Sequence, residues 1–130
     1  MSFTIAPDEL QNLLVIRYGG HVNAGEAERC LEEIQRVLPK LQSGFQILVD
    51  LTDIESMDVS CASWLRKIME LCNEKGVAAV VRVIPDPRGD IGLRIMSFFH
   101  YRGDVRIVTC ESIEEANKIL SIGQSGNSRA

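Results

Sequence analysis

The chain has 130 residues, of which 45% are apolar and 25% charged, and its formal net charge is −4. This length suits one compact domain with its own hydrophobic core and is short for two. The composition is that of a soluble globular protein, and no apolar run approaches the length of a membrane span. Basic residues are dispersed along an acidic chain, so we expect no nucleic-acid partner and no membrane insertion. We expect one domain over residues 1–120 and a disordered tail over 121–130, where Gly, Ser, Gln and Asn replace the apolar period.

The cysteines indicate a reducing compartment. They form no Cys-x-x-Cys pair and have no His nearby at metal-ligand spacing: Cys30, Cys61, Cys72 and Cys110. The first residues lack the basic start and apolar core of an export signal. We therefore expect a cytoplasmic protein with free, buried thiols and no bound metal.

The first half of the chain predicts two strands and a helix. Phe3–Ala6 and Leu13–Tyr18 are short apolar segments separated by Pro7, Asp8 and Glu9, which predict a turn between antiparallel strands. After Gly19, Gly20 and His21 interrupt the strand pattern, Asn23 is placed to cap a helix. The apolar positions of this helix follow a 3.6-residue period: Ala27, Cys30, Leu31, Ile34, Val37, Leu38 and Leu41.

The centre of the chain changes from a strand to a helix. The apolar run Phe45–Val49 predicts a strand buried on both faces, which ends at Asp50. From Cys61 the apolar residues follow a helical period, and this helix ends near Gly76. A polar turn separates the two elements, and Asp58 or Ser60 is the predicted helix cap.

The second half continues the alternation of strand and helix. The predicted elements are a strand, a helix, a strand and a closing helix: Val77–Ile84, Ile91–Tyr101, Val105–Thr109 and the segment after Ser112. Ser112 and Glu115 have the spacing of a capping box. The order predicts a single α/β domain with a mixed, mostly parallel sheet of about five strands and four helices.

Residues suited to catalysis do not form a recognisable site in the sequence. His21 and His100 are far apart, and no base is identifiable for a nucleophile at Ser56, Ser60 or Ser63. The loop Gly89-Asp90-Ile91-Gly92 fits neither nucleotide-binding fingerprint. We therefore expect a non-enzymatic protein with no catalytic residues, no metal and no cofactor.

Four short segments carry a resemblance to a known family. They read Gly20-His21-Val22-Asn23-Ala24, Ile47 to Thr52 with Ile54 and Met57-Asp58, Gly76-Val77, and Ser112-Ile113-Glu114-Glu115-Ala116. From about Leu13 to Leu120 the chain resembles the STAS domain of bacterial anti-sigma factor antagonists and sulfate transporter tails. In that family the centre usually reads Asp-Ser-Ser-Gly-Leu, and a partner kinase phosphorylates the serine after the Asp. Here that position is Val59, Ser60 matches the second serine, and Cys61 replaces the glycine.

The resemblance implies a regulatory protein-binding module whose partner is an anti-sigma factor or kinase. Ser60 is the candidate phosphoacceptor, and the candidate partner-binding residues lie around the central helix start and the loop after the fourth strand: Asp58, Val59, Ser60, Ser63, Asp86, Arg88 and Asp90. The alternatives are the STAS subunit of a lipid-transporting ABC complex and a small-ligand or nucleotide carrier. Ile91–Tyr101 is apolar on more than one face, so of Phe98 and Phe99 one is expected in the core and one at a partner or homodimer surface.

Overall fold

The computed structural model describes residues 3–85 and 105–128, with side chains through Leu120. The elements in chain order are β1 (Phe3–Asp8), β2 (Leu13–Val22), α1 (Ala24–Val37), the 3-10 turn η1 (Leu38–Lys40), β3 (Gln46–Met57), the 3-10 turn η2 (Val59–Cys61), α2 (Ala62–Lys75), β4 (Ala79–Val83), β5 (Arg106–Cys110) and α4 (Ile113–Ser128). The predicted helix Ile91–Tyr101, with Phe98 and Phe99, lies outside the described residues, so the described part contains three α-helices where the sequence predicts four in the whole chain.

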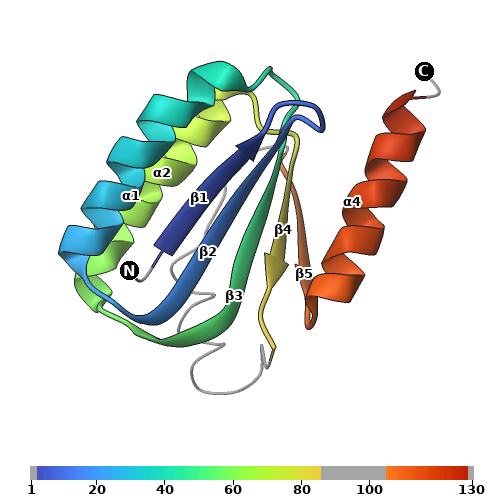
Figure 1. Cartoon of the computed structure of the whole chain (residues 1–130). Helices are drawn as coiled ribbons and strands as arrows, with labels where there is room; N and C mark the ends of the chain where they lie inside the picture. The colour runs from blue at the N-terminus through green and yellow to red at the C-terminus, as the bar shows by residue number, and fades with distance from the viewer. Residues whose placement is uncertain (1–2, 86–104, 129–130) are drawn as a thin grey trace.

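The strands form one five-stranded sheet in the order β1-β2-β3-β4-β5. β1 is antiparallel to β2, and every other neighbouring pair is parallel. Helices α1 and α2 cover one face of the sheet, and α4 covers the other (Figure 1). The predicted α/β class, the antiparallel start and the mostly parallel sheet are therefore confirmed.

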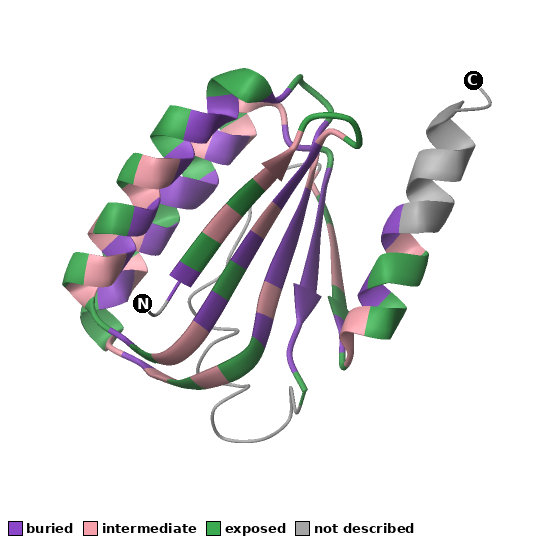
Figure 2. Ribbon diagram, viewed as in Figure 1, coloured by how far each residue is buried: buried purple, intermediate pink, exposed green. Residues whose placement is uncertain are grey.

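The two sheet faces bury two separate clusters of apolar side chains. Along β3, Ile47 and Val49 pack into the cluster beneath α1 and α2, whereas Leu48 packs into the cluster beneath α4. The larger cluster includes Phe45, which is fully buried, and the smaller one includes Leu120. Figure 2 shows the buried residues concentrated along the central strands and the helix faces turned towards them. Because side chains of a strand alternate between faces, a strand apolar at successive positions is buried on both sides.

The strands at the start and centre of the chain are longer than predicted. β1 runs through Asp8, because an edge strand tolerates the missing N–H of Pro7. β2 continues through His21 to Val22, so the predicted interruption at Gly19–His21 was wrong.

The prediction that the central strand ends at Asp50 was also wrong. β3 continues to Met57, and its second half pairs with the end of β2 through register shifts at Arg17/Gly19 and Gly20/His21. Local sequence underestimates these strands because their outer residues are polar and only one face is anchored in the core.

The helix ends agree with several predicted caps. The Asn23 side chain accepts a hydrogen bond from the N–H of Glu26 at 2.9 Å, and the Glu26 carboxylate accepts one from the N–H of Asn23. The Ser112 hydroxyl accepts a hydrogen bond from the N–H of Glu115 at 3.2 Å. The backbone of α4 runs past Ser121 to Ser128, where the sequence predicts a disordered tail. Extending an existing helix costs much less than nucleating one, which explains how weak helix formers continue it.

Gly76 ends α2 in the left-handed conformation, with φ of 100°. Its N–H donates to the carbonyls of Cys72 and Asn73, which closes the last turn of the helix. A Cβ at this position would lie 3.2 Å from the Cβ of Ser43 and even closer to its hydroxyl oxygen. Both the backbone conformation and the space therefore require glycine.

Gly76→Ala should lower the free energy of unfolding by about 1 to 3 kcal/mol, because alanine is strained at this φ and collides with Ser43. Gly25→Ala is the matched control, since Gly25 lies in the first turn of α1 without a positive φ and its added Cβ meets only the Asn23 side chain at 3.4 Å. The control should raise stability by roughly 0.5 to 1 kcal/mol. Urea unfolding of both variants measures the difference, and similar effects of the two would contradict this account.

Candidate partner-binding site

The candidate site is the turn Asp58–Cys61 between β3 and α2. The Asp58 N–H donates to the carbonyl of Val22 at 2.9 Å, and the Cys61 N–H donates to the carbonyl of Asp58 at 2.9 Å. Met57 and Cys61, on either side, are buried, whereas Val59 and Ser60 are exposed. The turn is therefore fixed at both ends and presents its middle residues to solvent.

The predicted side-chain cap at this turn was wrong. Asp58 precedes η2 without a side-chain capping hydrogen bond, and Ser60 lies inside η2, so that Cys61 occupies the position before α2. The Asp58 carboxylate turns instead towards β2, where its Oδ1 lies 3.2 Å from Nε2 of His21. The 3-10 turn inserted before α2 explains the difference, because Cys61 itself has helical dihedral angles and occupies the cap position.

His21 joins three segments through a hydrogen-bonded series that we call the His21 bridge: Ser56, His21 and Asp58. Its Nδ1 lies 2.5 Å from Oγ of Ser56, and its Nε2 contacts Asp58. His21 and Ser56 are register partners in the parallel pairing of β2 with β3. Sequence reasoning found no base near Ser56, and the structure corrects this. No local sequence signal indicates the bridge, because it follows from the register of β2 against β3.

The His21 bridge has the connectivity of a nucleophile, a base and an acid, but its environment suits a structural role better. The His21 side chain is 52% exposed and that of Asp58 is 45% exposed. Water at such positions screens the electrostatic support that an activated serine needs. The bridge fastens the end of β2 to the turn before α2. Within the described residues, no group of three His, Cys, Asp or Glu side chains is placed to hold a metal ion.

The structure brings four of the predicted contact residues together at the start of α2. Val59 is 75% exposed, and Ser60 and Ser63 are also exposed, with Asp58 partly exposed beside them. Val59 and Leu10 are the two large apolar residues that are exposed in the described part of the chain. The other three predicted contact residues, Asp86, Arg88 and Asp90, lie outside the described residues.

Trp64 belongs to the helical apolar period that begins at Cys61, and its ring also contacts a cation on α2. Trp64 is only partly buried, and Nζ of Lys67 lies 4.5 Å from the centroid of its ring. A cation over an aromatic face at an exposed site contributes roughly 0.5 to 1 kcal/mol. Ser63, Trp64 and Lys67 are spaced to share one helical face, so this pair extends the candidate site along α2.

All four cysteines are free and buried, as predicted. Burial raises the pKa of the Cys30 thiol to about 11, against a smaller opposing effect of its 3.2 Å contact with the Tyr18 hydroxyl. Burial likewise raises the pKa of Cys72 to about 12. The pKa of Cys61 is raised by burial and then by the Asp58 carboxylate, which outweighs the lowering expected at a helix start.

The raised thiol pKa values predict a loss of stability in alkali. Below pH 9, the ordinary value, Cys72 is neutral in both the folded and unfolded states, so its contribution is fully present. Between pH 9 and about 12 the unfolded state ionises first, and this contribution is lost. Cys72→Ala lacks the ionisation, so the advantage of the parent over this variant should narrow by up to about 1.4 kcal/mol per pH unit. Urea unfolding at several pH values checks this, and a pH-independent difference would exclude it.

A double-mutant cycle on His21→Ala and Asp58→Ala should give a coupling energy below about 1 kcal/mol, because both side chains are half exposed. Ser60→Ala should leave the coupling unchanged, since Ser60 is not part of the His21 bridge. A coupling of several kcal/mol would show that the bridge acts as a buried pair.

The comparisons with known proteins agree with this architecture. A chain of the anti-sigma factor antagonist SpoIIAA in its unphosphorylated form has a TM-score of 0.64 at 14% identity, covering 93% of this chain and 98% of that one. An anti-sigma factor antagonist, named as putative, from Thermotoga maritima gives a TM-score of 0.59 at 19% identity, covering 92% and 94%. A chain from the complex of diguanylate cyclase SiaD with its activator SiaC from Pseudomonas aeruginosa gives 0.51 at 15% identity, covering 81% and 89%.

At these identities the solved structures show a shared fold. Comparison with curated proteins gives no match. The sequence model of the STAS domain matches residues 4–116, which is most of the chain. This protein therefore belongs to the STAS domain family.

Proposed function

We propose that this protein is a non-enzymatic, cytoplasmic regulatory module of the anti-sigma factor antagonist type. It binds an anti-sigma factor or anti-sigma kinase through the turn Asp58–Ser60 and the first turn of α2. The observation that carries the proposal is the exposure of Val59 on a turn whose flanking residues, Met57 and Cys61, are buried.

The physical case rests on the difference between a fixed backbone and an exposed apolar side chain. A turn held by two backbone hydrogen bonds loses little conformational entropy when a partner binds it. Burying Val59 in a partner pocket would contribute on the order of 1.5 kcal/mol. Asp58, Ser60 and Ser63 supply the polar rim that such contacts usually have. The partly exposed Trp64 adds a residue type enriched at binding hot spots.

The named neighbours support a protein partner. Two are anti-sigma factor antagonists by name, and a third structure is a complex of an enzyme with its activator. None of the described helices has the length and apolarity needed to cross a bilayer. Asp86, Arg88 and Asp90 complete the proposed surface on sequence grounds alone, and a homodimer is proposed on the same grounds.

Regulation by phosphorylation would act at Ser60. Its position before α2 favours a negative charge near the helix N-terminus, whereas the Asp58 carboxylate in the same turn opposes it. Val59 occupies the usual acceptor position and has no hydroxyl. The proposed phosphoacceptor is therefore Ser60, where repulsion from the Asp58 carboxylate opposes the stabilisation that the helix N-terminus gives to a phosphate.

Two alternatives retain the same surface with another partner: the STAS subunit of a lipid-transporting ABC complex, and a small-ligand or nucleotide carrier. Native mass spectrometry of the purified protein distinguishes the carrier, since only that function produces a bound small molecule.

Val59→Asp should weaken binding of the host's anti-sigma factor at least tenfold, which is about 1.4 kcal/mol. Leu10→Asp is the matched control, because Leu10 is fully exposed in the β1–β2 turn at the other end of β2. Ser60→Glu, which imitates a phosphoserine, should also weaken binding. Calorimetric titration measures all three, with melting temperatures as the folding control. Equal affinities for Val59→Asp and Leu10→Asp would contradict the proposed surface.

A further inference from the structure

β1 forms one border of the sheet. In the described part of the chain it pairs with β2 and with no strand on its other side. A border strand offers backbone N–H and C=O groups to an added strand. Proline in such a strand turns its nitrogen away from the neighbouring strand, because it has no hydrogen to donate. By the alternation of a strand, Ile5 and Phe3 then turn their backbone groups outward like Pro7.

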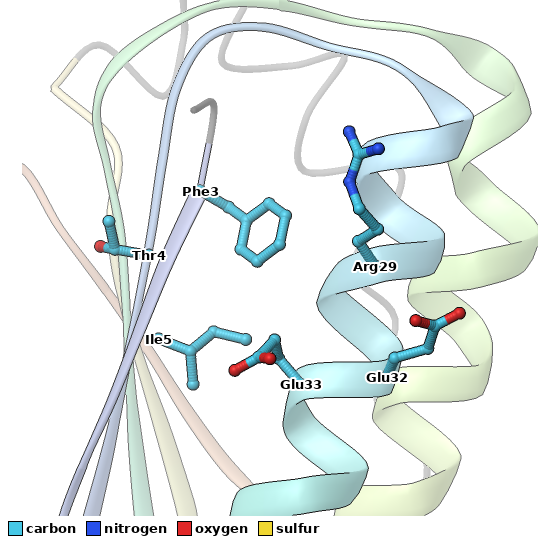
Figure 3. A pocket seen from close by; sticks show the side chains of 6 residues that line it. All are labelled: Phe3, Thr4, Ile5, Arg29, Glu32 and Glu33. Carbon is cyan, nitrogen blue, oxygen red and sulfur yellow. The ribbon is translucent and has the colours of Figure 1, made fainter.

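A pocket lies beside this border, between β1 and α1. It is lined by Phe3, Thr4, Ile5, Arg29, Glu32 and Glu33 and has a volume of about 420 Å³. Figure 3 shows the Phe3 ring and the Ile5 side chain between the strand and the helix, with the three charged side chains coming from α1. The pocket thus has an apolar floor at the sheet edge and a charged rim along the helix.

The charges on α1 indicate which occupant fits. Arg29, Glu32, Glu33 and Arg36 are spaced to lie on one face of the helix. Glu33 is already paired with Arg36 at 2.5 Å, whereas Glu32 is exposed. Because Arg36 already balances the charge of Glu33, Glu32 is the carboxylate at the pocket rim with which a cation beside the apolar floor can pair.

We infer that the border strand β1 and the adjoining pocket bind an extended segment of a partner protein, which adds to the sheet as a further strand. Backbone hydrogen bonds to Phe3 and Ile5 hold the segment. One apolar side chain enters the pocket, and a basic residue two positions away reaches Glu32. In this binding mode the main-chain hydrogen bonds supply affinity, and the alternate side chains that enter pockets supply specificity. The surface is separate from the Asp58–Ser60 turn, so it does not depend on the function proposed above.

The test uses a synthetic probe peptide, acetyl-Thr-Lys-Thr-Leu-Thr-Lys-Thr-amide, in which Lys and Leu share one face of an extended strand. Titrated into the isotope-labelled full chain, it should shift the amide NMR signals of Phe3 to Ala6 and of Arg29 to Glu33 in a saturable manner. Two analogues carry N-methyl groups on alternate amides, one on the odd-numbered and one on the even-numbered residues. The analogue whose methylated amides face β1 should bind at least tenfold more weakly than the parent peptide.

Charge exchange tests the rim. Glu32→Lys should weaken binding of the probe peptide at least threefold. The same variant should bind more tightly a version of the peptide with Glu in place of Lys. Glu114→Lys is the matched control, an exposed acidic residue on α4 at the other face of the sheet. No saturable shift at β1, shifts confined to Val59–Ser63, or an equal effect of the two variants would overturn the inference. So would concentration-dependent β1 shifts in the free protein, because they would show a second copy at this border.

Discussion

The parallel pairing of β2 with β3 beyond the rest of the sheet is the constraint on which the candidate site depends. Among the residues that the structure describes, β4 pairs with β3 as far as Asp50, and β1 pairs with β2 as far as Tyr18. Past these points β2 and β3 continue as a two-stranded ribbon that ends at Val22 and Met57, both of which are buried. Parallel strands need a crossover helix between them, and α1 supplies it on the face that also receives α2. The length of this two-stranded extension therefore determines the position of η2 and Val59, which follow the end of β3.

The ribbon also explains why polar residues surround the site without weakening the fold. Within the described residues, Leu51, Met57 and the partly buried Ile54 anchor the second half of β3 to the core, while Thr52, Asp53 and Glu55 are exposed. The His21 bridge adds side-chain contacts between β2, β3 and η2 in a region with few apolar contacts. A fixed but solvent-exposed turn is the arrangement expected of a binding surface, because most of its ordering cost is met in the free protein.

The border strand and the turn differ in how they could bind a partner. The turn presents an apolar side chain and a helix start, whereas β1 presents main-chain groups beside a pocket. Proteins usually protect exposed sheet borders, and here Pro7, which has no N–H to donate, limits pairing to the first part of β1. The two proposed surfaces are therefore independent, one on a turn and the other on a border strand.

The sequence by itself determined the α/β class, the order of elements, the helix cap at Asn23, the end of α2 at Gly76 and the burial of four free thiols. These features depend on local chemistry: apolar period, cap geometry and the dihedral freedom of glycine. The tertiary structure alone decided the length of β2 and β3, the loss of the Asp58 cap and the meeting of His21 with Ser56 and Asp58. Each of these depends on the register between strands that lie 35 residues apart in the chain, as His21 and Ser56 do. Such a register is fixed by packing across the whole sheet, and local propensity carries no record of it.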